Sequence, residues 1–202
     1  MAKKMGKKTT RKITRKTTKT STKAVRPKKT VAKPAAAIKA KAAVSPVYKL
    51  NAGDKAPDFK VVATSGKTLS LADFKGRKLV LYFYPKDNTP GCTLEGYDFK
   101  KLYSQFQKAG TEILGVSRDS LRSHESFREK CGFPFELLSD ETGELCKAFD
   151  VLQMKNNYGR VYEGIERATF VIDASGKVAK DWRKVKVDGH GEEVLNAVKA
   201  LK

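Results

Sequence analysis

A continuous apolar run, LVLYFY at residues 79–84, constrains the fold of this chain more than any other feature. Its length and its lack of alternation predict a strand that is buried on both faces, as at the centre of an α/β sheet. Pro85 ends this strand because it has no N–H to donate to a neighbouring strand. Pro90 and Gly91 then favour a tight turn from strand to helix. The sequence therefore predicts a strand–turn–helix unit with Cys92 at the start of the helix.

The residues after Cys92 predict that helix. A thiol in the first helical turn lies near unpaired N–H groups and the positive end of the helix dipole, and both favour the thiolate. Because the thiolate is the reactive form, Cys92 is a candidate nucleophile, and the alternative is a buried, inert cysteine. Thr89 is placed to hydrogen-bond the sulfur or an oxygen that approaches it.

The helix that begins near Cys92 is expected to end at Gly110. Five apolar residues at mostly three- and four-residue spacing are expected on its inner side: Leu94, Phe99, Leu102, Tyr103 and Phe106.

The Pro-x-x-x-Thr-x-x-Cys spacing after a buried strand favours the reactive alternative. Pro85, Thr89 and Cys92 reproduce the active-site motif of the peroxiredoxins, and the string YFYPKDNTPGCT resembles the bacterioferritin-comigratory, or Q-type, branch of that family. The resemblance continues through LGVSRDS, SHESF, FELLSDETGELCKAFDV and YEGIERATFVID, and covers roughly residues 50–202. It implies a thioredoxin-like fold and a thiol-dependent peroxidase, an oxidoreductase that reduces hydrogen peroxide and organic hydroperoxides.

The resemblance also implies roles for individual residues. Cys92 is the peroxidatic cysteine, whose thiolate attacks the O–O bond and becomes a sulfenic acid. Thr89 and the backbone N–H of Cys92 are expected to hold the peroxide, and Pro85 to shield the site from water. Arg167 matches the active-site arginine of the family by position, and its alternative is a surface arginine of a basic protein. Glu95 is expected to orient Arg167 through a charge-assisted pair, although many relatives have an amide there.

The sequence leaves open how the sulfenic acid is recycled. Many relatives have a resolving cysteine five residues after the peroxidatic one, where this chain has Tyr97, and others place it nearer Arg128. Cys131, one helical turn further on, is one candidate, which depends on geometry. Cys146 is a second, although core packing on the apolar side of its helix also explains it. The remaining possibility is a one-cysteine enzyme that an external thiol reduces. Thioredoxin is the reductant that the resemblance implies, with glutaredoxin or a small thiol as alternatives.

The rest of the pattern predicts strands that alternate with helices and a late hairpin. The expected class is α/β, with a thioredoxin-like fold, a central mixed β-sheet flanked by helices and a preceding disordered basic tail. About 150 residues suffice to bury a core. Strands are expected on both sides of Ser65 and Gly66 and over 111–116, 135–139 and 168–173, and helices over 121–131, 141–150 and 192–201, the last with Val194, Leu195, Val198 and Leu201 inward.

The N-terminal tail differs from the rest of the chain in charge. Residues 1–50 hold 14 Lys, 3 Arg and no acidic residue, whereas the remainder holds 25 basic and 22 acidic residues. The apolar residues of the tail are mainly Ala, too few to bury a core against the entropy of ordering. We therefore predict a disordered Lys/Ala/Thr-rich tail over 1–48 and one folded domain over 49–202.

Dense positive charge without acids is typical of polyanion binding through counterion release. No aromatic residue precedes Tyr48, so the hypothesis is phosphate contact rather than base stacking. The alternatives are a solvated tail with incidental contacts, an organelle transit peptide, which Lys excess and three prolines disfavour, and a nuclear localisation signal in a eukaryote. The candidate phosphate-binding residues are Lys3, Lys4, Lys7, Lys8, Arg11, Lys12, Arg15, Lys16, Lys28 and Lys29.

Several classes of protein are disfavoured by composition. Three cysteines and no apolar export signal predict a reducing, cytoplasmic setting, nucleoid-associated if the tail binds DNA. His124 and His190 are far apart and lack companion ligand spacing, so zinc is not expected. We expect no metal and no cofactor. No apolar stretch is long enough to span a membrane, and we expect a monomer, with a dimer as the alternative. The rival function is a nucleic-acid-associated redox sensor, or a histone-like protein with little peroxidase turnover.

Overall fold

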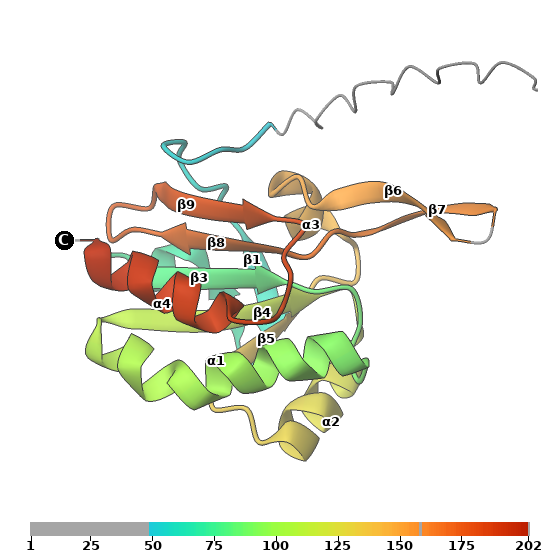
Figure 1. The fold of residues 1–202 in the computed structure, drawn as a ribbon, viewed down its shortest axis with the longest axis horizontal. Helices are drawn as coiled ribbons and strands as arrows, with labels where there is room; N and C mark the ends of the chain where they lie inside the picture. Colours follow the sequence, from blue (N-terminus) through green and yellow to red (C-terminus); the bar gives the residue numbers. More distant parts are fainter. Residues whose placement is uncertain (1–48, 158, 202) are drawn as a thin grey trace, which may run out of the picture. The chain divides into compact units, whose positions relative to one another are not determined.

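The computed structural model describes residues 49–157 and 159–201, and the predicted basic tail over 1–48 lies outside them. In this described part the chain forms one mixed sheet of seven strands in the order β2-β1-β5-β4-β3-β8-β9 (Figure 1). β3 runs parallel to β4 and antiparallel to β8, so it lies inside the sheet. The strands are β1 (Lys60–Ala63), β2 (Thr68–Ser70), β3 (Lys78–Phe83), β4 (Thr111–Ser117), β5 (Glu136–Ser139), β8 (Ala168–Ile172) and β9 (Val178–Arg183).

Helices cover both faces of the sheet. On one face, α1 (Pro90–Lys108), α2 (Leu121–Cys131) and α4 (His190–Ala200) contribute to a cluster that contains Val80 and Tyr82 of β3. On the other face, α3 (Glu144–Ala148) and the 3-10 helix η1 (Leu71–Phe74) pack against alternate residues of the same strand, including Leu81. Because successive side chains of a strand point to opposite faces, both clusters share β3. The predicted fold class and the doubly buried central strand are therefore confirmed.

One predicted helix is much shorter than expected. The helix expected over 141–150 is limited to the five residues of α3. Gly143 before it has φ +75° and Asp150 just after it has φ +54°, and both angles lie in the left-handed region. A residue in that conformation interrupts a right-handed helix. The two positions therefore confine α3 to little more than one turn.

One side chain of α1 faces the opposite way from the prediction. Leu94, expected on the inner side, is 59% exposed, whereas Phe99 and Phe106 are fully buried. Five residues separate Leu94 from Phe99, which places them about 140° apart around a helix of 3.6 residues per turn. The inner side of the first turns holds Cys92 and Glu95 instead. A thiol and a carboxyl group thus occupy the side of α1 where the sequence pattern places an apolar residue.

A second, two-stranded sheet was not predicted. β6 (Leu152–Asn157) and β7 (Arg160–Ile165) pair antiparallel and extend away from the main sheet (Figure 1). The string LQMKNN of β6 has no β-branched or aromatic residue, so it gives no strand signal. Pairing with β7 rather than local preference therefore defines this strand.

A buried polar network fixes the segment between β3 and α1. The carboxylate of Asp87 accepts hydrogen bonds from the hydroxyls of Tyr84, at 2.8 Å, and Ser123, at 2.7 Å. The Nδ1 atom of His124 lies 2.9 Å from the same carboxylate, and its Nε2 atom lies 3.1 Å from the carbonyl oxygen of Leu138. His124 is fully buried and Asp87 is 5% exposed. The network therefore joins the turn that precedes Cys92 to α2 and β5.

Replacing His124 with alanine is expected to lower the free energy of unfolding by about 3 kcal/mol, because Asp87 then stays buried with fewer partners and a cavity opens. Urea unfolding followed by the fluorescence of Trp182 measures the change. Lys55→Ala removes an exposed ion pair to Asp58, with N and O 3.8 Å apart, and serves as a control that should change little. A loss below about 1 kcal/mol for His124→Ala would show that the network does not stabilise the fold.

Candidate active site

The first turn of α1 holds Cys92 at the end of the central strand. Thr89 is the N-cap residue, with extended backbone angles, and Pro90 is the first helical residue. Proline suits this position because its missing N–H would have had no partner in the helix. The backbone N–H of Thr93 donates to the carbonyl of Thr89 at 2.9 Å and begins the helical bonding. Cys92, 2% exposed, therefore lies among backbone N–H groups that lack acceptors within the helix.

Arg167 reaches the same sulfur from a distant part of the chain. It precedes β8, and the antiparallel pairing of Phe83 with Ala168 brings the start of β8 to the end of β3 (Figure 1). The Nη2 atom of Arg167 lies 3.3 Å from the Sγ atom of Cys92. A Cβ atom on Gly91 would lie 3.4 Å from the same Nη2 atom, so the guanidinium packs directly against the first turn of α1.

Glu95 is the second partner of this guanidinium. Its Oε2 atom accepts a hydrogen bond from Nη1 of Arg167, and its Oε1 atom, also buried, has no hydrogen-bond partner in the described part of the chain. Burial raises the pKa of Glu95 to about 7, although the charge of Arg167 opposes the shift. Burial lowers the pKa of Arg167, but the charges of Glu95 and Cys92 outweigh burial and leave it raised. The guanidinium therefore stays positive, while Glu95 titrates near neutral pH.

The buried carboxyl of Glu95 should make a contribution to stability that falls as the pH rises from about 4.5 to about 7. Because the folded pKa is raised, the folded chain holds this proton more tightly, so the contribution is complete at low pH and is lost as the carboxyl ionises. Relative to Glu95→Gln, the natural chain should lose about 3 kcal/mol of unfolding free energy over that interval and nothing further above it. Urea unfolding of both proteins across this pH range measures the difference. Parallel profiles would contradict the prediction.

Thr89 and Pro85 are the other two residues of the predicted motif. Neither of them contacts the sulfur of Cys92 through a hydrogen bond in the structure. The hydroxyl of Thr89 donates to the carbonyl of Lys86 at 3.0 Å rather than to the sulfur. Its oxygen keeps lone pairs that can accept a further hydrogen bond. Pro85 is itself exposed, at the point where β3 ends. The predicted roles, in which Thr89 holds the peroxide and Pro85 excludes water, concern a bound substrate and therefore stay predictions.

The three cysteines are unpaired, and they lie on two faces of the sheet. Cys131, the last residue of α2, shares the apolar cluster of Cys92, and contact with its thiol raises the pKa of Tyr97. Lys100 also donates to the carbonyl of Cys131 at 2.7 Å. Cys131 thus lies beside the second and third turns of α1, whereas Cys92 lies in the first turn. Cys146 belongs to the cluster on the opposite face, where burial raises its pKa.

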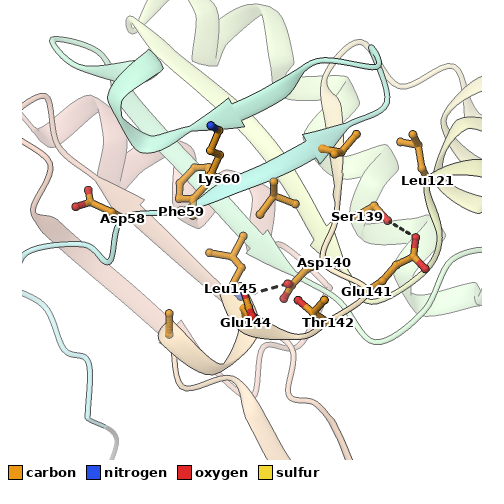
Figure 2. A pocket seen from close by; sticks show the side chains of 13 residues that line it. Asp58, Phe59, Lys60, Leu121, Ser139, Asp140, Glu141, Thr142, Glu144 and Leu145 are labelled. Carbon is orange, nitrogen blue, oxygen red and sulfur yellow. Dashed lines mark hydrogen bonds between the residues drawn. The ribbon is translucent and has the colours of Figure 1, made fainter.

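A separate cavity of about 600 Å³ lies between β1 and the segment over 139–145 (Figure 2). Its buried carboxylate, Asp140, accepts from the backbone N–H groups of Leu145, at 3.2 Å, and Cys146, at 2.8 Å. Asp140 is therefore committed to the start of α3.

Among residues 49–157 and 159–201 no group of three or more His, Cys, Asp or Glu is arranged to hold a metal ion. No helix in that part is long and apolar enough to cross a membrane.

Two neighbours of Arg167 were not predicted from the sequence. Gly91 lies against the guanidinium, where a Cβ atom would be at van der Waals distance, and Lys155 of β6 donates to the carbonyl of Ile165, at 2.5 Å, two residues before Arg167. A Pro-Gly pair before a helix indicates only a turn. Lys155 could not be identified as a neighbour of Arg167 from the sequence, because β6, the strand that carries it, has no sequence signal of its own.

Comparison with known proteins agrees with this geometry. Residues 52–181 match the model of the AhpC/TSA family. The chain is 52% identical over 143 residues to Peroxiredoxin Bcp of Xanthomonas campestris, which covers 71% of this chain and 89% of that protein. It is 49% identical over 146 residues to the putative peroxiredoxin bcp of Coxiella burnetii, which covers 72% of this chain and 97% of that protein.

Solved structures show the same likeness. Peroxiredoxin Q of Xanthomonas campestris has a TM-score of 0.71 at 50% identity and covers 74% of this chain and 98% of its own. BcpB of Mycobacterium tuberculosis has a TM-score of 0.68 at 30% identity and covers 76% of this chain and 99% of its own. The chain therefore belongs to the AhpC/TSA family and is a peroxiredoxin of the Bcp, or Q-type, branch, a class of peroxidase oxidoreductases.

Proposed function

We propose that this chain reduces hydrogen peroxide and organic hydroperoxides through a sulfenic acid on Cys92. The observation that most supports it is the 3.3 Å contact between Arg167 Nη2 and the buried Sγ atom of Cys92 at the start of α1. The guanidinium and the helix N-terminus both stabilise a thiolate. A bacterioferritin comigratory protein of Xanthomonas campestris, 49% identical, has been studied for alkyl peroxide reduction, which favours organic hydroperoxides as substrates here.

The proposed reaction is a two-electron displacement at oxygen. The thiolate of Cys92 forms an S–O bond with one peroxide oxygen as the O–O bond breaks. The electron pair of that bond leaves with the other oxygen, which takes a proton and departs as water or an alcohol. The sulfur is thereby oxidised to a sulfenic acid and the peroxide is reduced.

Each neighbouring residue has a proposed part in this step. The backbone N–H of Cys92 and the hydroxyl of Thr89 hold the peroxide in line with the sulfur. Arg167 stabilises the charge that develops on the leaving oxygen, and Glu95 orients the guanidinium through their pair. Pro85 limits the access of water at the end of β3.

For recycling we propose Cys131 rather than Cys146. Cys131 lies on the face of the sheet that holds Cys92, beside Tyr97, the position where many relatives carry their resolving cysteine. A disulfide requires Cα atoms within about 7 Å, so this bond requires the start of α1 and the end of α2 to meet. The thiol of Cys131 then attacks the sulfenic sulfur and releases water. Thioredoxin or a similar thiol reduces the disulfide. Direct attack by that external thiol on the sulfenic acid is the alternative.

Peptide mass spectrometry after one equivalent of hydrogen peroxide tests this route. With a sulfenic-acid trap present, the adduct should form on Cys92, and without the trap a Cys92–Cys131 disulfide should accumulate. A persistent sulfenic acid would favour the one-cysteine alternative. A Cys92–Cys146 bond, or oxidation that leaves Cys92 intact, would contradict the proposal.

We also propose that the tail over 1–48 holds the enzyme near nucleic acid. The support is its charge alone, since residues 1–50 carry 17 basic residues and no acidic residue. Binding through counterion release predicts little sequence preference and a steep decline of affinity with salt. A nucleic-acid-associated redox sensor would share the tail but turn over peroxide slowly.

Deleting residues 1–48 is expected to abolish salt-sensitive binding to duplex DNA while peroxide turnover stays within about twofold, because the tail contributes no residue to the proposed site. Fluorescence anisotropy with labelled DNA at a series of salt concentrations, beside a turnover assay, makes the comparison. Equal DNA binding by the truncated chain would refute the tethering. Slow turnover by the full-length chain would favour the redox sensor.

A further inference from the structure

The β6–β7 hairpin carries a lysine to the backbone that leads into Arg167. Lys155 lies in β6 opposite Tyr162 of β7, and its ammonium donates to the carbonyl of Ile165 at 2.5 Å. Ile165 is the last residue of β7 and is buried. Only Glu166 separates it from Arg167, whose guanidinium contacts the sulfur of Cys92. The ammonium therefore holds the main chain two residues before the cation of the proposed site.

Gly164 of β7 has no side chain, and this leaves room for the side chain of Lys155. A Cβ atom on Gly164 would lie 3.3 Å from the Cδ atom of Lys155 and 3.0 Å from a ring carbon of Tyr162. The aliphatic stem of Lys155 thus lies over the bare backbone of Gly164 as it crosses from β6 towards Ile165. This path brings the charged end of the side chain to the carbonyl of Ile165 and leaves it half-buried.

The charged end of Lys155 lies within the electrostatic field of the proposed site. Burial lowers the pKa of Lys155, the carboxylate of Glu166 opposes that shift, the guanidinium of Arg167 adds to it, and Cys92 opposes it. Arg167 and Cys92 are the two groups in contact at the proposed site. Glu166 balances part of the positive charge from the same segment. Lys155 thus interacts electrostatically with both groups, from an element that the strand pattern of the sequence does not reveal.

We propose that Lys155 is a positioning residue for the reaction of Cys92 with peroxide. Its ammonium fixes the carbonyl of Ile165, and so the backbone that presents Arg167, and it adds positive charge to the field at the sulfur. The inference rests on the proposed function of Cys92. It requires both the charge and the donor group of Lys155, not only the packing of its stem.

The test compares Lys155→Met, which keeps the stem but removes charge and donors, with Lys155→Arg, which keeps both. The measured quantity is the second-order rate of Cys92 oxidation by stoichiometric hydrogen peroxide in the full-length chain, at low and at high salt. Lys155→Met should be about three- to tenfold slower at low salt, and the difference should narrow at high salt because the charge is partly exposed. Lys155→Arg should stay within about twofold of the natural chain.

Lys177→Met is the matched control, since Lys177 lies beyond the opposite end of β8 and its charge is screened over that distance. It should leave the rate unchanged. A rate for Lys155→Met within twofold of the natural chain would overturn the inference, and so would an equal loss in Lys155→Met and Lys155→Arg. Both results leave the proposed function intact. If the natural chain reacts no faster than free cysteine, the proposed function fails together with the inference.

Discussion

Replacing Cys92 with serine is expected to reduce peroxide turnover by at least about 10³-fold, the largest effect of any single substitution in this chain. A serine hydroxyl is not ionised at neutral pH, and it offers no sulfur that can pass through a sulfenic acid. An assay that follows peroxide loss in the presence of excess thiol reductant measures the change. Circular dichroism should show an intact fold, because serine is close to cysteine in size.

Cys131→Ser and Cys146→Ser are the matched controls for this result. Cys131→Ser should keep the first oxidation of Cys92 at its natural rate and change only the later recycling. Cys146→Ser should keep both, because Cys146 packs in the cluster on the other face of the sheet. Substantial turnover by Cys92→Ser, or loss of the first oxidation in Cys131→Ser, would contradict the assignment of the nucleophile.

Arg167→Met is expected to slow the oxidation of Cys92 by about 10²- to 10³-fold, the usual cost of removing one preorganised donor from a developing negative charge. The substitution removes the guanidinium contact to Sγ at 3.3 Å and the partner of Glu95 together. Arg167→Lys should be intermediate, since an ammonium is a point charge that cannot contact both groups in the same planar geometry. Stopped-flow measurement with stoichiometric peroxide gives the rates.

The loss of Arg167 also leaves the buried carboxyl of Glu95 without its cation, which complicates the single variant. Arg167→Met combined with Glu95→Gln separates the two effects. If the guanidinium acts directly on sulfur and peroxide, the double variant stays slow. A recovery to near the natural rate would show that Arg167 serves only to neutralise Glu95. A loss below about threefold in Arg167→Met would contradict its proposed role altogether.

Local sequence patterns were sufficient for the elements that carry Cys92. The apolar run of β3 and the Pro-Gly turn before α1 are short-range signals, because a doubly buried strand and a helix start depend mainly on neighbouring residues. The structure has α2 over the predicted 121–131 and the β8–β9 hairpin where it was expected. Arg167 was identified only by family resemblance, since 75 residues separate it from Cys92 and no spacing rule reaches that far. The chemical roles of these residues stay predictions.

Long-range pairing explains what the sequence did not reveal. The strand β6 has no strand preference of its own and exists because β7 pairs with it. Leu94 fits an apolar helical pattern, yet α1 uses its inner side there for Cys92 and Glu95. Two partners of the Asp87 carboxylate, Ser123 and His124, come from α2, so its buried network could not be inferred from the loop alone. These departures lie at or near the proposed site, and functional sites are where local sequence preference is expected to fail.

The rate at which Cys92 itself is oxidised tests the account most directly. Full-length reduced protein is mixed with one equivalent of hydrogen peroxide, quenched with a sulfenic-acid trap at a series of times, and each cysteine peptide is quantified. Cys131 and Cys146 serve as internal references, and free cysteine under the same conditions serves as the external one. We expect Cys92 to react on the order of 10³ times faster than free cysteine. Oxidation of Cys92 at the rate of free cysteine would contradict it.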